Sequence, residues 1–180
     1  MKKVNENYFG AGDTGRIFEA RFMGSAVVDP QFVQELARLP RAEGYRFPKK
    51  VDVFRLYEKF YKGDLTNPTG IHAKELRLAV ADELGLSEEQ LERLRFYSTL
   101  QTPIDVLMGV DGFLSYQEAK NRPEQFVTLD ATLRTRKIKE GAKADVLIGE
   151  LPDAVQEEDA YFEAIQGYAQ QIAQKFQLRA

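Results

Sequence analysis

The sequence predicts one α/β (α+β) domain, in which a helix is followed by a three-stranded antiparallel meander and flanked by further helices. Apolar residues recur at helical spacing before Pro103 and again after Pro152, whereas the segment between them has the composition of short strands. The connections between those strands are shorter than the roughly twelve residues that a parallel crossover needs. With 180 residues, of which 43% are hydrophobic, the chain can bury one substantial core.

Residues 1–70 are predicted to form a helical N-terminal addition. Apolar side chains at helical spacing indicate three helices in it, over residues 16–23, 29–39 and 51–61. The turn-rich segment 63–70 then separates the addition from a core of residues 71–180. We expect that segment to be a loop, so the whole of residues 1–180 is interpreted as a single domain.

The core is predicted to begin with a helix over residues 72–84. Projection at about 100° per residue places Glu83 on the apolar face of this helix and Glu75 at its edge. A carboxylate on a buried face needs a partner, so Glu83 is a candidate site residue. A further helix is expected over residues 87–95, because Ser87 opens a capping-box pattern.

Strand-like composition follows the helices of the core. Three strands are expected, over residues 109–116, 125–133 and 144–151. Their short connections favour an antiparallel meander. The chain then returns to helical periodicity over residues 152–176, and we expect this amphipathic helix to cover one face of the sheet.

The composition excludes several classes of site. The chain has no cysteine, which rules out disulfides, a thiolate nucleophile and cysteine-ligated zinc, and favours a cytoplasmic setting. His72 is the only histidine, so a histidine-rich metal site is excluded as well. No apolar run approaches the roughly 18 residues of a membrane span, and membrane association is not expected. The net charge of −3 decides nothing about nucleic acid, because basic residues can gather on one face.

Two aspartates within the strand-like segments call for an explanation. Asp111 and Asp130 interrupt sequences that otherwise favour strands, and strands disfavour aspartate. A divalent cation is one of the few partners that compensates two buried carboxylates at once. Alternatively, Asp111 starts a turn with Gly112, and Asp130 pairs with a nearby arginine. The pattern alone leaves both interpretations open.

The order of these features resembles the core of the PD-(D/E)xK nuclease-like, or restriction-endonuclease-like, superfamily. The resemblance covers about residues 73–151: a helix with an acid on its inner face, then Gly109-Val-Asp-Gly-Phe-Leu, then Val127-Thr-Leu-Asp-Ala-Thr, then a basic stretch and Lys143-Ala-Asp-Val-Leu-Ile. It implies cleavage of nucleic-acid phosphodiesters that depends on Mg²⁺ or Mn²⁺, with DNA expected in preference to RNA. The superfamily usually adds a fourth strand, which is either absent here or supplied by residues 104–108.

The resemblance also implies roles for individual residues. Asp111 and Asp130 would be the metal-binding acids, and the carbonyl of Ala131 would face the same ion. Glu83 would be the carboxylate of the preceding helix, with Glu75 or Glu19 as alternatives. Asp105 and Asp145 are alternates for the metal site.

The lysine of the superfamily pattern is not at its usual place. That pattern has a lysine two residues after the second acid, where this chain has Thr132. Lys137, Lys139 or Lys143 could take the role from nearby, and Lys137 is the first choice. A lysine there would stabilise the charge that develops on the phosphoryl group. The departure leaves an inactive relative of the superfamily as a possibility.

The basic stretch after Asp130 is the predicted contact with nucleic acid. Arg134, Arg136, Lys139 and Lys143 would lie beside the metal site, where phosphates pass. The alternative is a solvated hairpin whose charges protect a sheet edge. At the level of function, the alternative to a nuclease is a non-catalytic interaction or inhibitor protein of phage or mobile-element type, with a protein partner bound through the helical N-terminal region.

Overall fold

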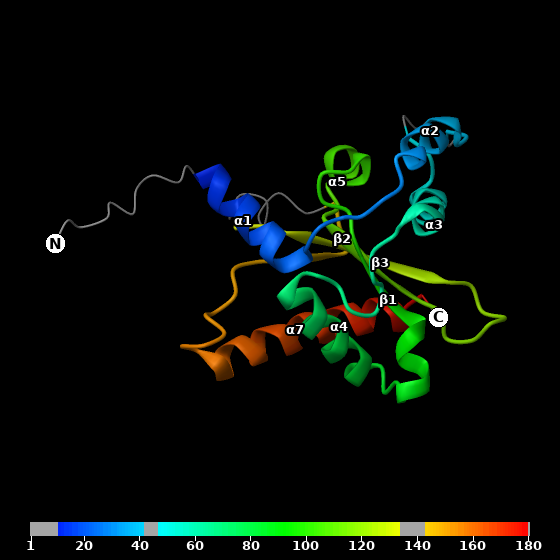
Figure 1. Cartoon of the computed structure of the whole chain (residues 1–180). Helices are drawn as coiled ribbons and strands as arrows, with labels where there is room; N and C mark the ends of the chain where they lie inside the picture. The colour runs from blue at the N-terminus through cyan, green and yellow to red at the C-terminus, as the bar shows by residue number, and fades with distance from the viewer. Residues whose placement is uncertain (1–10, 42–46, 134–142, 180) are drawn as a thin grey trace.

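The computed structural model describes residues 11–41, 47–133 and 143–179, with the side chains of residues 11–14 left out. Helices and strands follow one another along the chain as shown in Figure 1. They are α1 (Ala11–Met23), α2 (Gln31–Arg38), α3 (Lys50–Phe60), α4 (Ile71–Glu83), the 3-10 helix η1 (Glu88–Arg93), β1 (Leu94–Ser98), α5 (Pro103–Met108), β2 (Gly112–Tyr116), β3 (Gln125–Ala131), β4 (Val146–Ile148) and α7 (Glu158–Gln177). The α/β fold class expected from the sequence is therefore confirmed.

The strands form one mixed sheet in the order β1-β2-β3-β4. The β1–β2 and β2–β3 pairs are antiparallel, whereas β4 runs parallel to β3. The expected antiparallel meander is thus right for β2 and β3 but wrong for the third strand. Alternation buries Val146 and Ile148 whichever way β4 runs, so the sequence pattern carries no information on strand direction.

Strand β1 begins in the last two residues of a segment expected to be helical, residues 87–95. Of the helix predicted over residues 87–95, only the short 3-10 helix η1 forms, and it begins with the expected capping box of Ser87 and Gln90. From Leu94 the chain is extended and pairs with β2, because Leu94 and Phe96 then both reach the core. Tertiary burial outweighs the helical start signal here.

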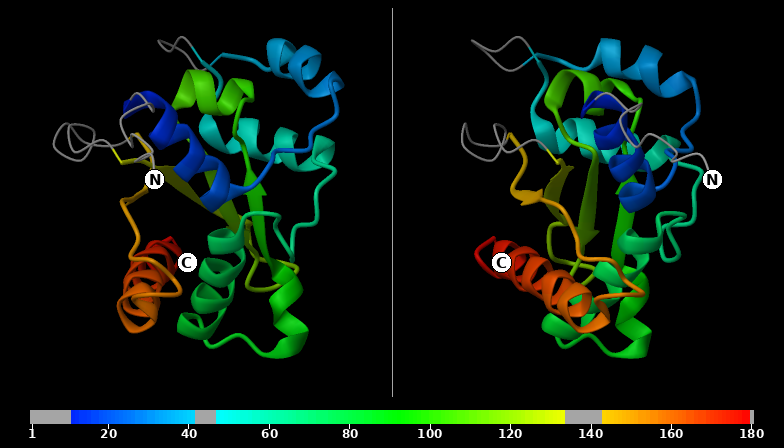
Figure 2. Two further views of the ribbon diagram at one scale, coloured as in Figure 1. Left: turned by 60° about the vertical axis from the view of Figure 1, so that its left-hand side comes forward. Right: turned by 90° about the vertical axis from the view of Figure 1, so that its left-hand side faces the viewer.

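Helices cover both faces of the sheet (Figures 1 and 2). Helices α4 and α7 pack together under one face, where they bury the alternate residues Phe96, Leu114 and Leu129. The opposite face carries Tyr97 and Phe113, which pack against α2, α3 and α5. Each strand therefore sends successive side chains into two different cores.

The helices before residue 70 pack directly on the sheet. Phe54 of α3 lies 4.7 Å from Phe113 of β2 between ring centroids, and the Tyr57 hydroxyl donates a 2.7 Å hydrogen bond to the Ser98 carbonyl. Phe22 and Met23, at the end of α1, are fully buried in the core around α4. The helical addition therefore contributes to the cores on both faces of the sheet.

Residues 104–108, suggested as a possible strand, form most of helix α5 instead. The Thr102 side chain caps this helix by accepting a hydrogen bond from the Ile104 N–H, and Gly109 ends it in the left-handed conformation (φ 62°). Glycine adopts that conformation without the cost that a side chain adds. The turn at Gly109 sends the chain into β2. None of the helices in the described part of the chain is long and apolar enough to cross a membrane.

Candidate functional site

Asp111, the residue just before β2, and Asp130 of β3 occupy neighbouring positions. The last paired residues at that end of the two strands are Gly112 and Leu129, and the next residues outward are the two aspartates. The Asp111 N–H donates to the Leu129 carbonyl at 2.9 Å, while the Asp111 carbonyl accepts from the Thr99 N–H at 2.9 Å. Backbone hydrogen bonds on both sides therefore fix Asp111 between β1 and β3.

Both acids are buried, Asp111 with 4% and Asp130 with 1% of their surface exposed. Burial first, and then the charge of Asp130, raises the pKa of Asp111 to about 8. The Ala131 N–H opposes this by donating a 2.9 Å hydrogen bond to Asp111 Oδ2. A pair of this kind is stabilised by a shared proton or by a cation bound between the two carboxylates.

Ala131 presents its backbone to the same place. Its N–H points toward Asp111, whereas the N–H of Thr132 points the other way and donates to the Ile148 carbonyl of β4 at 2.8 Å. In an extended strand the N–H and C=O of one residue point to the same side. The carbonyl of Ala131 therefore lies on the Asp111 side of β3.

Glu19 of α1 is the helix carboxylate that the structure brings near the pair. Its charge is among those that raise the pKa of Asp111. Glu83, the first choice from the sequence, accepts hydrogen bonds from Gln166 and Gln170 of α7, the second at 3.4 Å. Glu83, the last residue of α4, is thus engaged with α7, whereas Glu19 is the acid that acts on Asp111.

The other acidic candidates have structural partners. Asp105 also raises the pKa of Asp111, and its Oδ2 accepts a 2.7 Å hydrogen bond from the Gln101 N–H. Glu75 accepts a hydrogen bond from the Tyr161 hydroxyl, which also lies 2.7 Å from His72 Nδ1. These contacts join α4 to α7 and leave His72 with a packing role.

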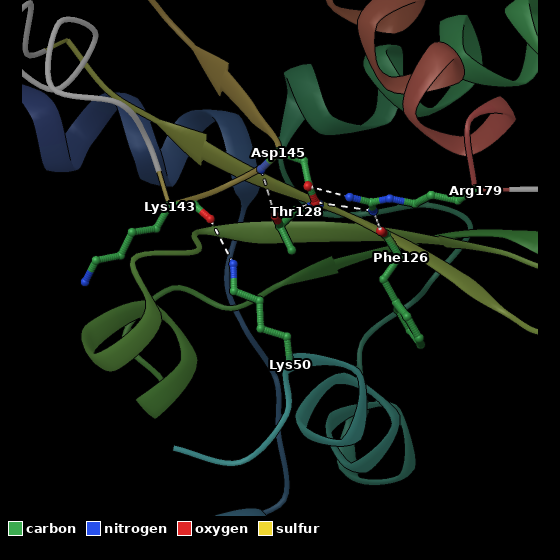
Figure 3. Close-up of polar contacts among 6 residues, drawn as sticks. All are labelled: Lys50, Phe126, Thr128, Lys143, Asp145 and Arg179. Carbon is green, nitrogen blue, oxygen red and sulfur yellow. Dashed lines mark hydrogen bonds and ion pairs between the residues drawn. The ribbon is translucent and has the colours of Figure 1, made fainter. Parts of the chain in front are cut away.

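Asp145 stabilises the edge of β3. Its Oδ2 accepts from the N–H and the hydroxyl of Thr128, at 2.9 and 2.8 Å, and its Oδ1 pairs with Arg179 Nη2 at 2.6 Å (Figure 3). All of these contacts are made before β4 begins. Asp145 is therefore committed to the sheet and not to the acid pair.

Lys143 is the one candidate lysine in the described part of the chain. Lys137, Lys139, Arg134 and Arg136 all lie outside the described residues. The aliphatic stem of Lys143 runs beside Gly109, two residues before Asp111, and its side chain points away from Lys50 (Figure 3). Its carbonyl accepts a 2.9 Å hydrogen bond from Lys50 Nζ. Thr132, at the usual lysine position, is buried with 2% of its surface exposed.

Comparisons with protein-family models, with curated proteins and with solved structures found no match. The chemistry of the site therefore has to be judged from its own donor atoms. Within the described ranges, no three histidine, cysteine or acidic side chains are grouped closely enough to hold an ion by themselves. Mg²⁺ keeps several waters and is commonly held by one or two carboxylates together with substrate phosphates. Asp111, Asp130 and the Ala131 carbonyl fit that requirement, and they would not suffice for zinc.

Residues that the sequence did not single out gather at a cleft separate from the pair. Lys50, Arg55 and Arg179 line a cleft on the α3 side of β3. In the sequence these are ordinary helix and terminal cations, far apart from one another. No local pattern could have identified them, because only the packing of α3 and α7 around β3 brings them together.

Proposed function

We propose that this protein is a Mg²⁺-dependent nuclease that hydrolyses nucleic-acid phosphodiesters. The observation that carries the proposal is the pair Asp111 and Asp130, two buried carboxylates side by side on adjacent strands. Burying two like charges together is unfavourable unless a proton or a cation compensates them. The resemblance to PD-(D/E)xK enzymes, with acids at these same points, supports the cation.

Each residue of the site has a definite task under this proposal. Asp111 and Asp130 would hold the ion together with the Ala131 carbonyl. When bound, Mg²⁺ would polarise the phosphoryl group and lower the pKa of an attacking water. The Ala131 N–H holds Oδ2 of Asp111 in place, so that Oδ1 is the oxygen directed to a ligand. Asp111 has to lose its proton to act, so binding of the ion would release a proton near neutral pH.

Two further groups would complete the site. Glu19 supplies a third carboxylate close to Asp111, where it would accept a proton or bind a water of the ion. The side chain of Lys143 lies beside Gly109, two residues before Asp111. Lys137 stays a candidate from the sequence alone. A lysine ammonium there would stabilise negative charge on the phosphoryl oxygens.

The test is a cleavage assay with matched variants. The purified protein is incubated with single-stranded DNA, duplex DNA and RNA, in Mg²⁺, in Mn²⁺ and in chelator. We expect metal-dependent cleavage that falls at least about a hundredfold in Asp111→Asn and Asp130→Asn, since each change removes a ligand of the ion. Asp159→Asn, which removes an exposed acid of α7, is the control and should cut like the parent.

Two results would overturn the nuclease proposal. One is absence of cleavage on all three substrates with either metal, and the other is cleavage by the Asp130→Asn variant at the parent rate. Calorimetric titration with Mg²⁺ separates the ion from the chemistry, because it requires no substrate. Parent protein that binds Mg²⁺ but cuts nothing would be a metal-binding protein without this activity.

A non-catalytic interaction protein is the second candidate. It is favoured by an apolar groove of about 510 Å³ between α2 and α5, lined by Val33, Leu36, Leu107 and Met108 among others. Val33 and Leu107 leave about half of their surface exposed, at 54% and 48%. Exposed apolar patches of this kind mark binding surfaces for other molecules. This candidate would replace the nuclease if the parent protein neither cuts nucleic acid nor binds Mg²⁺.

A further inference from the structure

A second cleft, of about 440 Å³, opens between helix α3 and the edge of β3. Strand β4 pairs only with residues 129–131 of β3, so no strand among the described residues lies beside the earlier part of β3 on that side. The charged residues that line the cleft are Lys50, Arg55, Glu124, Asp145 and Arg179. A cleft of this volume lies within the size range of small-ligand sites, about 300 to 1,000 Å³.

Asp145 and Arg179 neutralise each other at one wall of the cleft. Asp145 pairs with Arg179 and accepts two hydrogen bonds from Thr128, while Arg179 also donates to the Phe126 carbonyl (Figure 3). These side chains satisfy the backbone of β3 where a strand is missing. The pair is thus a structural part of the wall and adds little net charge to the cleft.

Lys50 and Arg55 are the cations left to act on a ligand. Both are exposed residues of α3, and no carboxylate of the described residues lies within ion-pair distance of either. Lys50 Nζ donates to a neutral acceptor, the Lys143 carbonyl, at 2.9 Å. Glu124 is the one remaining acid among the described lining residues. The free charge of the cleft is therefore positive in a chain whose net charge is −3.

The cleft lies on the same face of β3 as Asp130. Thr128, in its wall, and Asp130 lie on the same face of that strand, since Leu129 between them points into the opposite core. Two residues of a strand span about 7 Å. An extended anionic chain held by Lys50 and Arg55 would therefore continue to Asp130 without a bend.

We propose that this cleft binds the phosphate backbone of a single nucleic-acid strand and guides one phosphodiester to Asp130. Lys50 and Arg55 contact the phosphates, as cationic grooves do when they track the backbone of a single strand. What happens at Asp130 rests on the proposed nuclease function, whereas binding in the cleft does not. The two ideas can therefore fail separately.

The experiment measures fluorescence anisotropy of labelled oligo-dT in chelator, where no metal-dependent cleavage occurs. Lys50→Ala and Arg55→Ala are each expected to weaken binding by about tenfold, the loss of one charge-assisted contact. Each should also reduce the slope of log affinity against log salt by about 0.7, the value for one phosphate of a single strand. Lys59→Ala, an exposed lysine of the same helix outside the cleft, is the matched control and should bind like the parent.

Several outcomes decide the proposal. Parent protein that does not bind oligo-dT, or binds a duplex of the same length more tightly, overturns it. So does equal weakening by Lys59→Ala, which would indicate general charge attraction. Loss of binding in the two cleft variants with no cleavage by the parent in Mg²⁺ keeps the cleft and removes the nuclease. If the parent cleaves nucleic acid but both cleft variants bind oligo-dT as the parent does, the nuclease proposal stands and the cleft proposal is overturned. Circular dichroism of each variant confirms that the fold is kept.

Discussion

At the scale of single residues, the acid pair dominates the electrostatics of this protein. Asp111 and Asp130 are nearly without solvent contact, and the raised pKa of Asp111 is caused first by burial and then by Asp130. Such an arrangement is unfavourable for the folded chain without a cation. Functional sites often carry pKa shifts of this size, because the same burial that costs stability prepares a ligand or a proton donor.

Replacing Asp111 by asparagine should stabilise the metal-free protein at pH 8. The shape is kept, and the amide oxygen still accepts the Ala131 N–H, but the like charge next to Asp130 is gone. Because one unit of pKa shift corresponds to about 1.4 kcal/mol, the gain in unfolding free energy is on the order of a few kcal/mol. Urea denaturation at pH 5 and pH 8 measures it.

The contrast between the two pH values is the informative part. At pH 5 Asp111 is largely protonated in the fold, so Asp111→Asn should have a small effect there. In 10 mM Mg²⁺ the order should reverse at pH 8, because the parent gains stability from binding the ion and the variant does not. An equal effect of the substitution at both pH values would contradict the pKa assigned to Asp111.

At the scale of secondary-structure elements, the close approach of two glycines joins α1 to α4. Gly24 follows α1 with a left-handed φ of 71°, and Gly70 precedes α4. A Cβ placed on Gly70 would lie only 2.1 Å from the Phe22 carbonyl oxygen and 2.5 Å from the Gly24 nitrogen. Backbone atoms cannot move aside as flexible side chains do, so both positions require glycine.

Gly70→Ala should therefore lower the unfolding free energy by about 1–3 kcal/mol or more, the usual cost of overpacking a core. Gly167→Ala is the matched control, because nothing lies within 4 Å of a Cβ at that position in the middle of α7. That change should raise the unfolding free energy by roughly 0.5–1 kcal/mol through helix propensity. Chemical denaturation of the two variants beside the parent gives both values. If Gly70→Ala raised the unfolding free energy and Gly167→Ala lowered it, α1 and α4 would not meet as described.

At the scale of the whole molecule, two buried aspartates give stability opposite dependences on pH. Asp111 has a raised pKa, so its protonated form favours the fold and stability is lost as pH rises from about 4, near the pKa of the unfolded chain, to about 8. For Asp145, burial acts to raise the pKa, but Arg179 and Thr128 outweigh it and hold the pKa below its usual value. A carboxylate of that kind contributes stability that is lost as the pH falls below about 4.

The metal-free protein should accordingly be most stable at about pH 4 to 5, with the free energy of unfolding falling on both sides. Arg179→Ala should remove most of the decline on the acid side, because Asp145 then has no cation to favour its ionised form. It should also lower stability at neutral pH by about 1–3 kcal/mol, since Asp145 and the Phe126 carbonyl lose their partner. Denaturation curves across the pH range test both statements, and an unchanged acid limb in the variant would disprove the role of Asp145.

The sequence by itself determined the helices with clear periodicity and the two central strands. Helical spacing located α2, α3 and α4 to within two residues and α7 at its end, although α7 begins six residues later than expected, and alternation identified β2 and β3. The short connection between these strands implied that they are antiparallel, which placed Asp111 next to Asp130. Period and loop length are local properties, so local sequence carries them.

Only the tertiary structure decided how distant segments meet. It began β1 at the end of a segment expected to be helical and turned β4 parallel to β3. It also brought Glu19 rather than Glu83 toward Asp111, and gathered Lys50, Arg55 and Arg179 around one cleft. In each case the deciding contribution to the free energy is burial against a segment that is distant in the sequence. This contribution depends on how whole faces pack together, so no pattern within one segment can predict it.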